Sequence, residues 1–112
     1  LVNHVQFSPD TFFIASASFD KSIKIWNGHT GEFLFNFRGH VGPVYQIGWS
    51  PDSRLLLSGS KDTTLKCWNI KVKRLMFELP GHADEVYCVD WSPDGEKAVS
   101  GSKDRRLRIW KN

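Results

Sequence analysis

The sequence predicts an all-β protein built from three copies of one unit of short antiparallel strands. The stretch SPDSRLLLSGSKDTTLKCWN (50–69) matches SPDGEKAVSGSKDRRLRIWK (92–111) after a shift of 42 residues, and SPDTFFIASASFDKSIKIWN (8–27) falls into the same register. No insertion interrupts the three copies. Apolar residues recur with the period of two that is typical of strands, and no stretch shows a helical period.

The second copy shows the first three strands of the unit in chain order. The run VYQIGW (44–49) is apolar and aromatic and closes at the Ser-Pro-Asp turn 50–52, where proline fixes φ and aspartate caps the turn. The run RLLLSGS (54–60) is mostly apolar, as expected for a strand that is covered on both faces. The run LKCWN (65–69) alternates between two faces. We therefore expect three strands joined by tight turns.

A fourth run, RLMFELP (74–80), follows a basic turn and completes the unit. Its counterpart in the first copy is EFLFNFR (32–38), which has Phe at every second position. Four short strands per 42 residues, joined by tight turns, indicate one blade of a β-propeller. We expect three antiparallel blades, at 1–38, 39–80 and 81–112, with the last blade lacking its outer strand and the ring not closed.

Composition limits the classes of protein that are possible. The chain has 112 residues, of which 40% are hydrophobic and 13% aromatic, so it has enough apolar material for a core. No apolar run approaches the about 20 residues of a membrane helix, and the first residues do not read as a signal peptide. Cys67 and Cys88 have neither a metal-ligand nor a redox spacing, which favours a reducing, intracellular setting. The net charge of +3 is compatible with acidic partners or RNA without establishing either.

The repeated polar residues resemble those of the WD-repeat family over the whole chain. The residues that carry the likeness are Gly39-His40, Gly81-His82, Asp62, Asp104, Trp26, Trp68 and Trp110. The family's characteristic aspartate after the tryptophan is replaced here by Asn27, Asn69 and Lys111. That aspartate lies after the strand, so its loss does not threaten the fold.

The resemblance implies a buried tetrad of hydrogen-bonded side chains in each complete unit. The aspartate accepts from the histidine ring and from turn amides, the serine bridges to the histidine, and the indole N–H donates to the serine. The expected members are His40, Ser58, Asp62 and Trp68 in the second unit, His82, Ser100, Asp104 and Trp110 in the third, and Ser16, Asp20 and Trp26 in the first. The first unit shows no tetrad histidine, because the position 42 residues before His40 falls before residue 1 and His4 aligns with Gln46 instead. We therefore expect its blade to be the loosest.

A structural role explains these tetrads better than catalysis. Buried polar groups must satisfy one another, whereas catalysis needs one exposed nucleophile in one pocket. The same residue types recur in every unit, so we interpret them as structural and expect no enzymatic activity, no cofactor and no metal site. His40 and His82 lie in neighbouring blades and have no further ligand at a metal-binding spacing.

Two groups of residues are candidates for binding. By resemblance, the face of the disc near the central channel uses the residue five after the tetrad histidine and the residue just before the tetrad aspartate. These positions are Asn3, Tyr45, Tyr87, Phe19, Lys61 and Lys103. Aromatic and cationic side chains suit a protein-binding hot spot, and the alternative is an ordinary solvated surface.

The second candidate is the basic cluster near the C-terminus, formed by Lys103, Arg105, Arg106, Arg108 and Lys111. On an alternating strand, Arg106 and Arg108 share a face. The cluster is suited to RNA phosphates or an acidic protein. The alternative is a charged edge that resists edge-to-edge pairing of strands.

Several stretches resemble the last blades of Notchless-type WD-repeat proteins. They are SASFDKSIKIW (16–26), RGHVGPVYQIGWS (38–50), SKDTTLKCWN (60–69) and LPGHADEVYCVDWSPDG (79–95). The resemblance implies a scaffold in assembly of the large (60S) ribosomal subunit, in the nucleolus and nucleus, with partners in the pre-ribosomal particle and possible contact with rRNA. Such proteins engage the midasin ATPase through a ubiquitin-like domain that lies outside this sequence. A WD-repeat scaffold of another kind is the alternative.

Three blades do not close a ring, since propellers typically have four to eight. Open ends expose apolar faces, which favours association. We therefore expect self-association, and we prefer two copies with six blades to three copies with nine.

Overall fold

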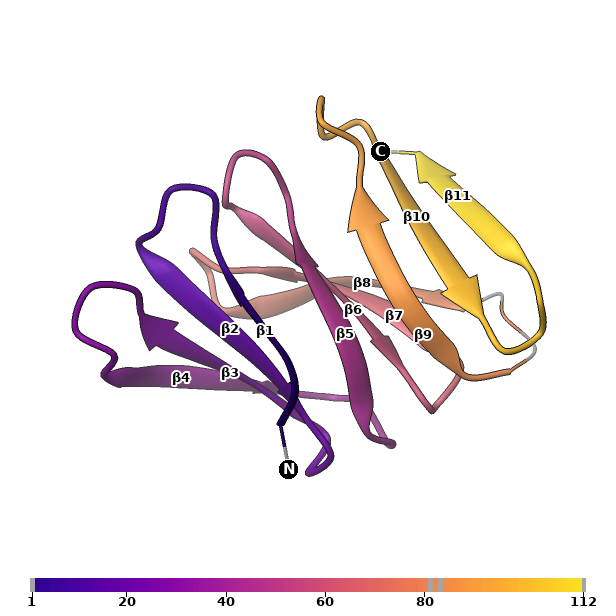
Figure 1. Cartoon of the computed structure of the whole chain (residues 1–112), viewed down its shortest axis with the longest axis horizontal. Coiled ribbons are helices and arrows are strands. Elements are labelled where there is room, and N and C mark those ends of the chain that lie inside the picture. Colours follow the sequence, from indigo (N-terminus) through magenta and orange to yellow (C-terminus); the bar gives the residue numbers. More distant parts are fainter. Residues whose placement is uncertain (1, 81, 83, 112) are drawn as a thin grey trace.

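The computed structural model describes residues 2–80, 82 and 84–111. Within them, the chain forms three antiparallel sheets and no helix (Figure 1). The first sheet contains β1 (Val2–Phe7), β2 (Phe13–Ser18), β3 (Ser22–Asn27) and β4 (Phe33–Arg38). The second contains β5 (Val44–Trp49), β6 (Leu55–Ser60), β7 (Thr64–Asn69) and β8 (Arg74–Pro80). The third contains β9 (Val86–Trp91), β10 (Lys97–Ser102) and β11 (Leu107–Lys111).

Each sheet is a meander in which every strand pairs with its neighbours in sequence. The predicted all-β fold and open ring are confirmed, because the sheets of four, four and three strands lie side by side without closing (Figure 1). The structure contains no helix that is long and apolar enough to cross a membrane, as judged over the residues that it describes.

The Ser-Pro-Asp turns fold through their own side chains. The Ser50 hydroxyl donates to Asp52 Oδ1 at 2.6 Å and accepts from the Leu55 N–H at 3.0 Å. The other two Ser-Pro-Asp turns repeat both hydrogen bonds. Ser53 closes the turn with a φ of 63°, in the left-handed region. The turn chemistry that the sequence shows therefore sets the connection between the first two strands of each sheet.

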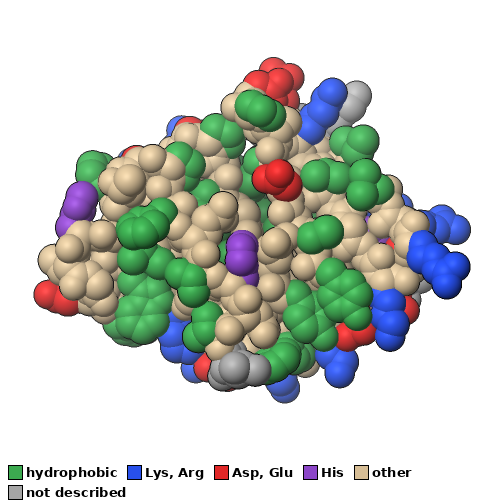
Figure 2. Space-filling model, viewed as in Figure 1, with side chains coloured by type: hydrophobic (Ala, Val, Ile, Leu, Met, Phe, Trp, Pro, Cys, Tyr) green, Lys and Arg blue, Asp and Glu red, His purple; other side chains and the backbone are tan. Residues whose placement is uncertain are grey.

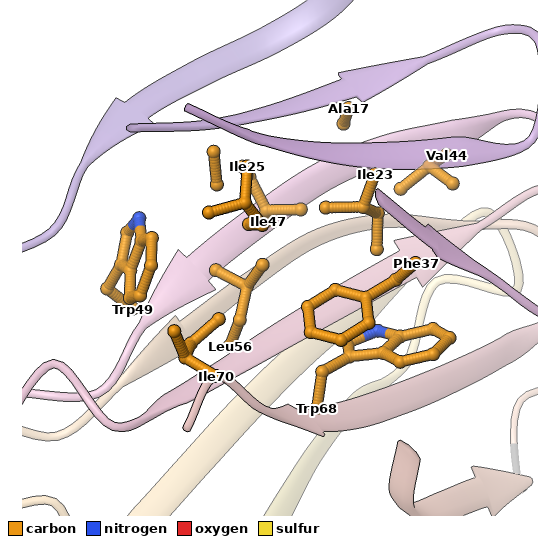
Figure 3. Close-up of a cluster of buried hydrophobic side chains, with 11 residues drawn as sticks. Ala17, Ile23, Ile25, Phe37, Val44, Ile47, Trp49, Leu56, Trp68 and Ile70 are labelled. Carbon is orange, nitrogen blue, oxygen red and sulfur yellow. The ribbon is translucent and has the colours of Figure 1, made fainter. Parts of the chain in front are cut away.

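The core lies between the sheets rather than within any one of them. Strand β5 packs against β1 on one side and against β9 on the other. Figure 3 shows the cluster between the first two sheets, in which Phe37 stacks on Trp68 with ring centroids 4.7 Å apart. Leu56 and Ile47 of the second sheet are fully buried in the same cluster. Burying such a side chain contributes about 1.5–3 kcal/mol, so contact with its neighbours stabilises each sheet.

Candidate functional site

The tetrad side chains of the second sheet lie within hydrogen-bonding distance of one another. His40 Nδ1 lies 2.8 Å from Asp62 Oδ2, and Nε2 shares a hydrogen bond of 2.7 Å with Ser58 Oγ. The Trp68 indole N–H donates to Ser58 Oγ at 2.8 Å. Because a carboxylate can only accept, Nδ1 must be the donor to Asp62. The His40 and Asp62 side chains are only 1% and 4% exposed.

Asp62 is the anchor of this group, because both of its oxygens accept. Oδ2 also takes the Val41 N–H at 3.0 Å, and Oδ1 takes the Thr64 N–H at 3.0 Å and the Thr64 hydroxyl at 2.6 Å. Burial alone would raise the pKa of Asp62, but the hydrogen bonds from His40 and Thr64 outweigh it and hold the pKa well below its ordinary value. Both oxygens of this buried carboxylate are therefore occupied by hydrogen bonds from side chains and backbone groups of the same sheet and of the segment that precedes it.

The third sheet repeats the arrangement with a longer histidine–aspartate contact. His82 Nδ1 lies 3.2 Å from Asp104 Oδ2, and Nε2 shares a hydrogen bond of 2.7 Å with Ser100 Oγ. The Trp110 indole N–H donates to Ser100 Oγ at 3.0 Å. His82 is buried. Each histidine thus lies in the segment before the first strand of its sheet and is hydrogen-bonded to a serine of the second strand, β6 or β10.

The first sheet holds only part of such a group. The Trp26 indole N–H donates to Ser16 Oγ at 3.0 Å, as its counterparts do. Asp20 instead accepts from Ser22 and from Lys24, whose ammonium lies 3.0 Å away. These hydrogen bonds, from Ser22 and then from Lys24, lower the pKa of Asp20, although its side chain is 52% exposed. An ammonium ion therefore takes the place of the imidazole as a donor to this aspartate.

A β-bulge lies in the first strand of each sheet, at the residue that the resemblance singles out for binding. These strands are β1, β5 and β9. In the second sheet Val44 pairs with Ser60 and the next pairing passes over Tyr45. The pairing likewise passes over Asn3 in β1 and over Tyr87 in β9. A bulge leaves one residue out of the ladder and changes the direction of its side chain. The three residues are therefore set apart from the regular strand by the backbone itself.

The bulges bring Tyr45 and Tyr87 together across two sheets, with ring centroids 5.1 Å apart. Both phenols donate to the carboxylate of Glu85, at 2.9 Å from Tyr45 and 3.2 Å from Tyr87, and Lys103 Nζ lies 3.7 Å from the same carboxylate. Burial and Glu85 raise the pKa of Tyr45 to about 12. We call these four residues the tyrosine cluster. Tyr87 is 45% exposed and presents the cluster to solvent.

Sequence reasoning did not find Glu85. Its counterpart one repeat earlier is Pro43, so comparison of the repeats gave no signal for a carboxylate at this position. The remaining predicted binding residues lie at equivalent places in the first and second sheets. Asn3 donates from its side-chain amide to the Val44 carbonyl at 2.8 Å, and Phe19 and Lys61 are exposed in the turns between the second and third strands. The structure joins Tyr45, Tyr87 and Lys103 into one cluster.

The basic cluster is less uniform than expected. Arg105 occupies the turn before β11 with a φ of 67°, and Arg106 lies in the same turn rather than on the strand, because β11 begins at Leu107. Arg106 is exposed, whereas Arg108 is partly buried, and its Nε has no hydrogen-bond partner within the described part of the chain. The side chain of Lys111 lies outside the described residues. Figure 2 shows Lys and Arg side chains gathered at the edge of the molecule where Figure 1 places the third sheet.

Among the described residues, no group of three or more His, Cys, Asp and Glu side chains is arranged to hold a metal ion.

Comparison with known families assigns all three units. The family described as WD domain, G-beta repeat matches residues 2–27, 31–69 and 73–111. The chain belongs to the WD-repeat family. Its three sheets are blades of an open propeller fragment, which we call blades one, two and three.

The curated relatives of this WD-repeat chain include proteins of ribosome assembly. The chain is 72% identical over 43 residues to the Notchless protein homolog of Arabidopsis thaliana. This stretch covers 38% of the chain and 9% of that protein. It is 62% identical over 37 residues to Ribosome assembly protein 4 of Saccharomyces cerevisiae, a stretch that covers 33% of the chain and 7% of that protein. It is 41% identical over 51 residues to the Protein SEC13 homolog of Dictyostelium discoideum, a stretch that covers 44% of the chain and 17% of that protein. Each match thus spans less than a fifth of the relative's length, and the expected resemblance to Notchless-type proteins is confirmed.

Proposed function

We propose that this chain is a non-enzymatic protein-binding scaffold that acts in assembly of the large ribosomal subunit. The tyrosine cluster is the observation that carries the binding role. It places two aromatic rings, a carboxylate and an ammonium group at the junction between blades two and three. High identity over short segments to the Notchless protein homolog and to Ribosome assembly protein 4 supports the ribosomal context.

The tyrosine cluster has the properties of an interface hot spot. Tyrosine combines a large apolar surface with a polar tip, and hot spots are enriched in it. The hydrogen bonds to Glu85 hold both phenols in place before a partner arrives. Binding to a side chain that is already ordered loses less conformational entropy than binding to a mobile one. The cluster therefore offers a pre-organised contact surface, with Asn3 and Phe19 of blade one and Lys61 of blade two as further contacts.

In this proposal the partners are proteins of the pre-ribosomal particle, and the chain acts in the nucleolus and nucleus. Contact with a midasin-like ATPase belongs to a separate ubiquitin-like domain of such proteins, as the resemblance implies. The three blades then contribute a docking surface for the particle and take no direct part in the ATPase contact.

The replacement Tyr87→Ala tests this role. We expect the fraction of the tagged chain that co-sediments with large-subunit precursors in a sucrose gradient to fall about tenfold or more, as for a hot-spot residue worth about 1.4 kcal/mol or more. Phe12→Ala is the matched control, because Phe12 is an exposed aromatic residue in a turn of blade one and is 58% exposed. Unchanged co-sedimentation of the Tyr87 variant, with its urea midpoint preserved, would contradict the proposal.

Direct binding of RNA is a second candidate, favoured by the exposed Arg106 and by the Arg108 Nε that has no partner among the described residues. If these two side chains contact phosphates, replacing both by Ala lowers the slope of log affinity for single-stranded rRNA against log salt by about 1.4. The matched control replaces the exposed residues Lys21 and Lys71 by Ala, which removes the same amount of positive charge. Equal slopes for both double variants, or a dissociation constant weaker than about 1 µM, would exclude this function.

A further inference from the structure

A groove lies between blades one and two, at the opposite end of the strands from the tyrosine cluster. Tyr45 lies at the start of β5, whereas Asp52, on the wall of the groove, follows the end of that strand. The groove has a volume of about 480 Å³, which is typical of clefts that bind ligands. Both blades contain all four strands, so each wall of this junction is complete. We call this space the interblade groove, and its lining includes Leu34, Phe35, Ile70, Lys71 and Lys73.

The floor of the interblade groove is apolar and is held in place by the core. Phe13, Phe35 and Ile70 line it. Ile70 is only 5% exposed, and Phe13 stacks on Trp49 with ring centroids 6.3 Å apart. Leu34 adds a wall that is 42% exposed, at a bulge where the pairing of β3 with β4 passes over it. An apolar side chain of a partner therefore meets a surface that is already formed.

Two lysines of the turn between β7 and β8 make one wall of the groove basic. Lys73 Nζ lies 5.1 Å from the centre of the Phe35 ring, a cation–π contact between the two blades. Lys73 has a φ of 59°, in the left-handed region, where the first copy has Gly31 with a φ of 78°. Glycine adopts this conformation at less cost than lysine, so the turn alone does not explain the lysine. Neither Lys71 nor Lys73 forms a salt bridge within the described part of the chain.

The charges in the interblade groove are separated by sign. Asp52 is paired with Arg54, whose Nε lies 3.5 Å from Oδ2. Asp10, in the turn after β1, is the other carboxylate, and its N–H donates to Ser53 Oγ at 3.0 Å across the junction. Strand β1 packs on β5, whereas the lysine turn precedes β8, at the far edge of the second sheet. The negative side of the groove therefore lies near the inner strands, and the positive side lies near the outer strand.

This separation of charge distinguishes between two classes of anionic partner. A nucleic acid carries a negative charge on every phosphate, so it would bring negative charge toward Asp10 as well as toward the lysines. A peptide can carry acidic residues on one side of an apolar residue only, so that its charges match the lysine wall and its apolar side chain matches the floor. Charge complementarity therefore favours a peptide.

We propose that the interblade groove binds a peptide segment of another protein in which a leucine or phenylalanine adjoins a run of acidic residues. The apolar side chain packs on Phe35 and Ile70, and the carboxylates lie against Lys71 and Lys73. Ion pairs exposed to solvent contribute little each, so the apolar contact supplies most of the affinity and the lysines supply selectivity. This second site is separate from the tyrosine cluster and extends the proposed function to another class of partner.

Fluorescence anisotropy with two labelled peptides tests the class of ligand. The first peptide is Gly-Ser-Leu-Phe-Asp-Glu-Glu, and in the second the three acidic residues are replaced by Lys. We expect a dissociation constant of about 100 µM or lower for the acidic peptide, and a value about tenfold higher or more for the lysine peptide, which meets like charges. A dissociation constant above about 1 mM for the acidic peptide would overturn the proposal.

The double variant Lys71→Glu with Lys73→Glu tests the basic wall. We expect it to weaken binding of the acidic peptide about tenfold or more and to strengthen binding of the lysine peptide, because the sign of the wall is reversed. The matched control, Lys21→Glu with Lys97→Glu, makes the same change in charge at exposed positions that do not line the groove. Lys21 has a φ of 74°, so it also matches Lys73 in backbone conformation. Equal losses in both double variants would rule out this site.

Single substitutions separate this site from the tyrosine cluster and from other occupants. Leu34→Ala should weaken binding of the acidic peptide about threefold or more, whereas Val72→Ala, at a 55% exposed position that does not line the groove, should leave it unchanged. Tyr87→Ala should also leave it unchanged, so failure of the groove and failure of the tyrosine cluster are told apart. Single-stranded RNA that displaces the acidic peptide and loses affinity in the double variant of Lys71 and Lys73 would overturn the proposal. Self-association of the chain that this double variant abolishes would overturn it in favour of a second copy.

Discussion

We expect the replacement Asp62→Asn to lower the free energy of unfolding by about 2–4 kcal/mol at pH 7. The variant keeps the shape of the side chain but loses one acceptor, because the amide nitrogen can only donate. Both Asp62 oxygens accept from His40, Val41 and Thr64, so at least one of these donors is left facing another donor in a buried site. Urea unfolding followed by tryptophan fluorescence measures the change.

The pH dependence gives this prediction a specific signature. The pKa of Asp62 is lower in the folded state than its ordinary value of 3.8. The stabilisation by its charge is therefore fully present above pH 3.8 and is lost as the pH falls toward the folded-state value. We expect the difference between wild type and variant to shrink over that acidic range. Asp20→Asn is the matched control: this carboxylate is 52% exposed, and we expect a loss below about 1 kcal/mol. Equal losses at both sites would contradict the special role of the buried tetrad.

We expect the replacement Gly59→Ala to lower the free energy of unfolding by about 1–3 kcal/mol, a typical effect of overpacking. An added Cβ lies 2.7 Å from Val86 Cγ1 and 3.1 Å from Val89 Cγ1, both on the facing strand of blade three. Valine has few rotamers on a strand, so neither methyl group moves aside easily. The strands of blades two and three must separate to make room.

Gly48→Ala is the control for this second prediction. It places a Cβ at the same junction, but the nearest atoms lie 3.5 Å or more away, which is ordinary contact. Alanine at such a site changes stability little, or raises it by restricting the unfolded chain. Urea midpoints measured for the two alanine variants under one set of conditions check the prediction. If Gly59→Ala is as stable as Gly48→Ala, the close approach of the two strands is wrong.

The repeat explains how much of the fold could be predicted from the sequence. Three copies in one register provide three versions of each turn and strand, so the alternation in LKCWN (65–69) and the Ser-Pro-Asp turns are seen repeatedly. The members of the tetrads were implied by the resemblance to the WD-repeat family, whose tetrad positions match the recurring His, Ser, Asp and Trp residues. The distance between blades could not be predicted: Ala17 occupies in blade one the position that Gly59 has in blade two, and only the structure shows that Val86 leaves no room for a Cβ at Gly59.

The candidate binding site shows the same limit. Tyr45 and Tyr87 were chosen by resemblance, but the bulge that sets them apart is invisible to the repeat, because every copy contains it and the spacing does not change. Glu85 could not be chosen at all, since it occurs in one blade only. The position of Arg106 was missed by one residue, because the start of β11 is a local matter of turn geometry. A bulge that leaves the spacing of the copies unchanged, and a residue that one copy has alone, are both hidden from a comparison of repeats.

The tyrosine cluster joins two blades, with Tyr45 from one and Glu85, Tyr87 and Lys103 from the next. In the proposed function, a partner that binds the cluster contacts both blades and therefore stabilises the angle between them. Partner binding and the angle between the two blades are therefore thermodynamically linked. By reciprocity, a strain that opens this angle lowers the affinity for the partner by the same free energy. In the proposed function, the affinity for the partner therefore depends on the angle between blades two and three.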